Sequence, residues 1–182
     1  GNKEPARDRS AASQSGYSDT ADMCAAMNMD EIKKRQGDLP QFLSYDAYGV
    51  PAAGDSPIDA DLLNKLMASL NQIFAPANPP QLSLEPTDCP DAKQTSPASY
   101  CPSTNAIGVD MPALAEVGTP RSESQGVLLQ GDNTALSMVT SRYMLALQHE
   151  RGAPLQSTTT ALRTACLTGV AQSKMSEPGV PL

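Results

Sequence analysis

The long apolar segment near the C-terminus sets the strongest limit on how this chain can fold. From about Asn133 to Arg151, apolar residues fall on nearly every side of a helix rather than along one stripe. A surface helix keeps one polar face, so a helix of this kind is usually enclosed by other elements. We therefore expect it to be the central helix of the fold, ending at Gly152 and Pro154.

Shorter patterns predict the elements around it. Apolar spacing, capping residues and helix-ending Gly and Pro predict further helices. One begins at about Asp19 and has a break before Ile32, others span 59–74 and 111–117, and the last begins at Ser157. Alternation predicts short strands at 81–85 and 105–110, with a loop over 86–104 between them. The sequence thus predicts a helix-dominant α+β fold, with a small antiparallel or mixed sheet and two long C-terminal helices.

One domain accounts for most of the chain. We expect it to span residues 18–175, after a flexible lead-in or linker at 1–17 and before a tail at 176–182. The sequence begins at Gly1 without Met or a signal peptide. We therefore expect a mature or trimmed fragment, with a signal or a lipid or membrane anchor removed upstream.

Charge and histidine content exclude several classes of function. The formal net charge of −7, with no basic cluster, argues against a nucleic-acid partner. No apolar run approaches the roughly 20 residues that a transmembrane helix requires. The single histidine, His149, excludes an H-E-x-x-H zinc motif and any two-histidine metal site. We expect no metal and no other cofactor.

The four cysteines bear on the redox compartment. Cys89 and Cys101 flank a stretch rich in Pro, Ser and Thr, where a cross-link would add roughly 3 kcal/mol of stability. Cys24 and Cys166 lie in helical patterns far apart in the sequence. Four cysteines allow three pairings, and the sequence leaves the pairing open. The loop argument favours an oxidising compartment; four free thiols in a cytosolic domain is the alternative.

Three segments, in this order, resemble one protein family. They are Ser99–Pro102 followed by a strand ending at Asp110, Gly131-Asp132 before the long helix, and the segment 164–170, Thr-Ala-Cys-Leu-Thr-Gly-Val. Together they resemble segments of the neutral zinc metallopeptidase family, zincin-like bacterial proteins that are often exported and that include mycobacterial lipoprotein peptidases. The resemblance spans roughly residues 58–173 and implies a zincin-like fold in the cell envelope or outside the cell.

The sequence departs from that family at the positions that carry the family's zinc ligands and general base. The resemblance implies an H-E-x-x-H motif on the long helix, in which two histidines bind zinc and the glutamate activates water. Aligning the helix assigns the histidine, glutamate and histidine positions to Ser141, Arg142 and Leu145. The acidic positions of the next helix correspond to Ala161 and Ala165. Because none of these side chains can replace the family's residue, the resemblance implies a degenerate member without a metal site.

The sequence leaves two interpretations of Arg142 open. A charge in mid-helix is costly unless it is paired. Its guanidinium either replaces the lost zinc charge and meets Asp110 or Glu116, or it extends to the surface.

Three functions remain for such a chain. The first is a catalytically inactive, metallopeptidase-like domain of an exported or envelope protein that binds a protein or peptide partner. Its partner would pair with a strand edge at Ile107, Gly108 and Val109, since edge pairing needs only backbone groups. The alternatives are a metal-free hydrolase that uses His149 as a base, and a purely structural envelope domain.

Overall fold

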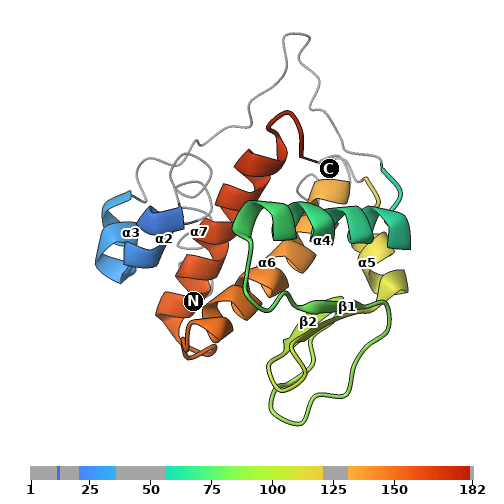
Figure 1. The fold of residues 1–182 in the computed structure, drawn as a ribbon, viewed down its shortest axis with the longest axis horizontal. Helices are drawn as coiled ribbons and strands as arrows, with labels where there is room; N and C mark the ends of the chain where they lie inside the picture. Colours follow the sequence, from blue (N-terminus) through green and yellow to red (C-terminus); the bar gives the residue numbers. More distant parts are fainter. Residues whose placement is uncertain (1–11, 13–20, 36–55, 121–130, 181–182) are drawn as a thin grey trace.

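The computed structural model describes residue 12 and residues 21–35, 56–120 and 131–180 of the 182-residue chain. In chain order, the described elements are α2 (Ala21–Ala26), α3 (Met29–Arg35), α4 (Ala60–Phe74), β1 (Gln81–Ser83), β2 (Ala98–Cys101), β3 (Ala106–Val109), α5 (Met111–Gly118), α6 (Asp132–Glu150) and α7 (Thr158–Met175). Helices dominate, one small sheet is present and two long helices come last, as the sequence predicts (Figure 1). Most of the predicted lead-in at 1–17 lies outside the described residues.

Helix α6 is the centre of the main hydrophobic core. It packs against α4, α5, α7 and strands β2 and β3. Side chains on several of its faces are buried, among them Ala135, Val139, Tyr143, Met144 and Leu147. The prediction of a central helix is confirmed, because apolar residues on all sides require neighbours on all sides.

The helix starts follow the local sequence. The Asp59 carboxylate accepts a hydrogen bond from the backbone N–H of Leu62 at 2.8 Å, at the start of α4. The Ser157 hydroxyl accepts one from the N–H of Thr160 at 3.1 Å, at the start of α7. These side chains satisfy amides that have no partner within the helix, so the capping residues mark where each helix begins.

The sheet has the strand order β1–β3–β2. Strand β3 pairs with β1 in parallel and with β2 in antiparallel register. The predicted strands at 81–85 and 105–110 are present as β1 and β3. The prediction of a continuous loop over 86–104 is wrong, because β2 lies inside it. All four residues of β2 are buried, so the strand lacks the alternation that reveals a half-buried strand.

A second, smaller core joins the N-terminal helices to α7. Figure 1 shows α2 and α3 beside α7, on the side away from the sheet. This second cluster contains Ala12, Cys24, Met27, Ile32, Leu162, Cys166 and Val170. A disulfide between Cys24 and Cys166 crosses it, and a second disulfide joins Cys89 to Cys101. The structure therefore selects one of the three pairings that the sequence leaves open.

Candidate functional site

The five positions assigned to a former metal site lie on α6 and α7 in different surroundings. On α6, Arg142 donates to Ser141 Oγ and to the backbone oxygen of Ala98 in β2, while Leu145 packs against the main core. On α7, Ala165 packs against the second cluster and Ala161 is exposed. Helices α6 and α7 do lie side by side. The hydrogen bonds between them come from other residues, however, such as the bond from Gln148 Nε2 to Thr164 Oγ1 at 2.7 Å.

Arg142 bridges α6 to the segment that leads into β2. Its Nε donates to the backbone oxygen of Ala98 at 2.8 Å. Its Nη2 lies 3.4 Å from Thr95 Oγ1, and its Nη1 lies 3.3 Å from Ser141 Oγ. The guanidinium thus connects the central helix with an edge strand of the sheet.

The environment of Arg142 differs from both interpretations that the sequence leaves open. Among the described residues, its hydrogen-bond acceptors are all neutral oxygens. The Asp110 carboxylate instead accepts from the N–H of Ala113 at 3.2 Å and caps α5. Burial lowers the pKa of the Arg142 guanidinium, because desolvation disfavours the charged form. The side chain is therefore a partly buried cation that binds backbone and hydroxyl oxygens.

The predicted peptide-binding edge at Ile107, Gly108 and Val109 is wrong. These residues belong to β3, which is the middle strand and pairs on both sides. Its face is covered as well, since a Cβ added at Gly108 would lie 2.9 Å from Thr87 Oγ1. The error follows from the missed strand β2, without which β3 would lie at the border of the sheet.

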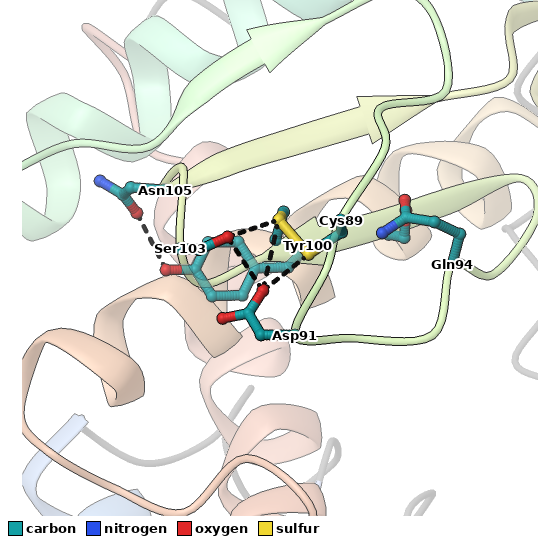
Figure 2. The surroundings of a disulfide bond; sticks show 8 residues. Cys89, Asp91, Gln94, Tyr100, Ser103 and Asn105 are labelled. Atoms are coloured by element: carbon teal, nitrogen blue, oxygen red, sulfur yellow. Dashed lines mark hydrogen bonds between the residues drawn. A yellow bond between two sulfur atoms is a disulfide. The ribbon is translucent and has the colours of Figure 1, made fainter.

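A carboxylate lies against the disulfide of the loop before β2 (Figure 2). Asp91 Oδ1 lies 2.9 Å from Cys89 Sγ and 3.7 Å from Cys101 Sγ, and it accepts a hydrogen bond from Ser103 Oγ at 3.0 Å. Disulfide sulfurs carry no proton, so the two sulfur contacts are not hydrogen bonds. Cys89, Asp91 and Cys101 form a three-residue group with metal-ligand atoms. Both sulfurs are consumed in the disulfide, so this group offers a metal only the carboxylate.

Tyr100, in β2, binds the turn that joins β2 to β3. Its hydroxyl donates to Asn105 Oδ1 at 3.0 Å, and Asn105 Nδ2 donates to the backbone oxygen of Asn78 at 3.0 Å. Asn105 has a φ of 48°, a left-handed conformation that Asn tolerates better than most residues. Burial raises the pKa of Tyr100 to about 12, with help from the negative charges of Asp91 and Glu150. Tyr100 is thus a neutral donor at physiological pH.

His149 lies at the exposed end of α6. Its ring makes an edge-on contact with the Tyr100 ring, with centroids 6.1 Å apart. In the described part of the chain, no hydrogen bond joins its side chain to a Ser, Cys or carboxylate. A catalytic base needs a nucleophile within hydrogen-bond reach and an orienting partner. The geometry therefore gives no support to the hydrolase alternative.

Sequence reasoning missed the contacts of Asp91, Thr95 and Asn105, although it noted Asp91 with Asp88 as a pair of acids that could hold calcium. Their roles depend on partners that lie far away in the sequence or across a loop, such as Arg142 for Thr95 and Asn78 for Asn105. Only the contact of Asp91 with the disulfide had a signal in the sequence, because Asp91 follows Cys89 by two residues.

Comparison with protein-family models, with curated proteins and with solved structures finds no match for this chain. Within the described residues, none of the helices is both long enough and apolar enough to cross a membrane.

Proposed function

We propose that this chain is a non-catalytic domain of an exported or envelope protein that binds a protein or peptide partner, on a zincin-like scaffold without its zinc chemistry. The observation that carries the proposal is the environment of Arg142. At the position that the resemblance assigns to the general base stands a cation bound to neutral oxygens of β2 and of the segment before it. A guanidinium cannot accept a proton from water at physiological pH.

The other assigned positions support the same interpretation through their chemistry. The Ser141 hydroxyl donates to the backbone oxygen of Met138 at 2.7 Å, which commits its proton within the helix. Leu145, Ala161 and Ala165 have no atoms that bind a metal. Two disulfides support export, since structural disulfides are rare in reducing compartments.

The sheet offers one edge that a partner strand could join. At β2, the outer carbonyl of Ala98 already accepts from Arg142 Nε and from Thr95 Oγ1. Strand β1, by contrast, pairs only with β3 among the described elements. The Gln81 N–H donates toward β3, so the alternating pattern turns the Leu82 N–H outward. Leu84, just beyond the strand, is 37% exposed. We assign the binding edge to Gln81–Leu84 and the occupant to an extended peptide segment of the partner.

Two measurements test the loss of chemistry. Zinc analysis of the purified protein should find no stoichiometric metal, and turnover of casein or a peptide library should be absent with and without a chelator. Stoichiometric zinc, or turnover that a chelator abolishes, would contradict the proposal. Turnover that a chelator leaves intact but His149→Ala abolishes would instead establish the hydrolase alternative.

The binding edge has a separate test. Peptides selected from a displayed library should bind the wild type in an extended conformation, and their amide perturbations should centre on Gln81–Leu84. Leu82→Pro should abolish binding, because proline removes the outward N–H. Leu84→Lys, which keeps the backbone intact, should weaken it. A selected peptide that binds both variants as tightly as the wild type would overturn the assignment, provided that circular dichroism shows both variants folded.

A further inference from the structure

The binding edge Gln81–Leu84 has a carboxylate at each end. Glu150, the last residue of α6, accepts a hydrogen bond from the Asn78 N–H at 2.8 Å, three residues before β1 begins. Glu85 directly follows Leu84 and is exposed. A segment that pairs along this edge would therefore lie near a negative charge at both of its ends.

Asp91 adds a second charge at the first of these ends. Asn105 Nδ2 donates to the backbone oxygen of Asn78, and Asn105 Oδ1 accepts from the Tyr100 hydroxyl, both at 3.0 Å, so Tyr100 lies beside the start of β1 (Figure 2). The charges of Asp91 and Glu150 both act on that hydroxyl, where they add to the effect of burial on its pKa. The two carboxylates are therefore close to the same end of the edge.

Both carboxylates can accept further hydrogen bonds. Glu150 binds Asn78 through Oε1, and Asp91 binds Ser103 through Oδ1. Within the described residues, no hydrogen bond reaches Glu150 Oε2 or Asp91 Oδ2, and no ion pair joins either group to a lysine or arginine. A carboxylate accepts several hydrogen bonds, so each retains the capacity to bind a cationic donor.

The sequence around the edge is acidic as well. Residues 76–110 contain four acidic side chains and one basic side chain, Lys93. Residues 36–55, outside the described part, hold three aspartates and no lysine or arginine, while acids and bases balance in 1–20 and in 121–130. These outside segments therefore bring no net positive charge. A surface of one sign attracts a partner of the opposite sign and speeds its association.

We propose that the peptide bound at Gln81–Leu84 is basic, with a lysine or arginine at each end of an extended core. This inference rests on the proposed binding edge and adds the chemistry of its partner. The stretch from Asn78 to Glu85 spans at most about 23 Å when extended, so basic residues about six positions apart would reach both ends. Their side chains would donate to Glu150 and Asp91 at one end and to Glu85 at the other.

The test begins with a displayed library whose peptides have a core of alternating valine and threonine and randomised flanks. Selection on the wild-type protein should enrich lysine and arginine over aspartate and glutamate at the flanks. The selected peptide should perturb the amides of Gln81–Leu84. Replacing its basic flanking residues with glutamine should weaken binding roughly tenfold, and added salt should weaken binding of the original peptide, because salt screens exposed charges.

Matched variants of the protein locate the charge. Glu150→Gln keeps an oxygen that can accept from the Asn78 N–H but removes the charge, so the basic peptide should bind about threefold more weakly. The glutamine-flanked peptide should bind both proteins equally, since the interaction that the substitution removes is absent there. Glu85→Gln should act in the same way at the other end.

Glu177→Gln is the control for net charge. The Glu177 carboxylate binds Lys174 Nζ at 2.7 Å, just beyond the end of α7. Figure 1 shows this end of α7 on the opposite side of the molecule from the sheet. The control changes the net charge as Glu150→Gln does and should leave binding of the basic peptide unchanged.

The outcomes separate this inference from the proposed function. Peptides that perturb Gln81–Leu84 without an excess of basic flanking residues would overturn the inference and leave the binding edge standing. Equal affinity of the basic peptide for the wild type and Glu150→Gln, or an equal loss with Glu177→Gln, would overturn it too. If no selected peptide perturbs Gln81–Leu84, the proposed edge itself fails and this inference fails with it.

Discussion

At the scale of single residues, Arg142 shows how a partly buried charge can be held by neutral oxygens, which are its only hydrogen-bond acceptors among the described residues. Its planar guanidinium donates in several directions at once, so it reaches Ala98, Thr95 and Ser141 together. A lysine ammonium is a compact point charge and could not reproduce this fork. The residue therefore joins α6 to the start of β2.

This arrangement predicts the effect of removing Arg142. Arg142→Ala should lower the free energy of unfolding by about 1–3 kcal/mol, because hydrogen bonds from a charged donor are lost. The loss stays moderate since Thr95 Oγ1 still donates to the Ala98 oxygen, at 2.8 Å. Chemical denaturation measures it, with exposed Arg151→Ala as a control that should change stability by less than about 0.5 kcal/mol. Equal effects of the two substitutions would show that Arg142 contributes nothing to the structure.

Asp91 is the second residue whose charge has a local consequence. Cys101 is 1% exposed, so a reducing thiolate can reach the Cys89–Cys101 bond only at the half-buried Cys89. The Asp91 carboxylate lies 2.9 Å from that same sulfur. An incoming thiolate is negatively charged and is repelled there.

Asp91→Asn should therefore speed reduction of the Cys89–Cys101 disulfide by glutathione, roughly fivefold at low ionic strength. Mass spectrometry after alkylation gives the rate for each disulfide. High salt should shrink the difference, because it screens exposed charges. Asp88→Asn, which changes the same net charge nearby in the chain, should have a smaller effect. Identical rates for both variants would mean that Asp91 does not protect the bond.

At the scale of elements, the sequence predicts helices better than the sheet. The starts of α4 and α7 follow from Asp59 and Ser157, since a cap acts on amides two or three residues away. The central place of α6 follows from its apolar circumference. These signals are local, so they can be recognised in the sequence without knowledge of the rest of the fold.

Strand β2 has no such local signal. Its four residues are all buried, and they pair with β3 and pack on α6. Its stability comes from contacts that only the folded chain supplies, so tertiary context outweighs the proline-rich surroundings. Missing β2 also displaced the predicted peptide edge onto β3. The positions that the resemblance assigns to a metal site show the same limit, because an alignment of positions cannot tell which core Leu145 and Ala165 join.

At the scale of the whole molecule, the chain has one large core around α6 and a small second core that depends on long-range connections. Helices α2 and α3 have 6 and 7 residues, too few to be stable in isolation. The second cluster packs them against α7 through few apolar side chains. The Cys24–Cys166 disulfide, between residues 142 apart in sequence, ties this unit to the rest.

The two disulfides should therefore differ in what they stabilise. By loop-closure entropy, replacing Cys24 and Cys166 with alanine should cost about 5 kcal/mol, against about 3 kcal/mol for the short loop closed by Cys89 and Cys101. Chemical denaturation gives both values. Hydrogen exchange locates the effect: without Cys24–Cys166, protection should fall further in residues 21–35 than in α6, because the main core does not include the second cluster. Equal costs for the two bonds, or a uniform loss of protection over both cores, would show that the second core is held by packing rather than by its disulfide.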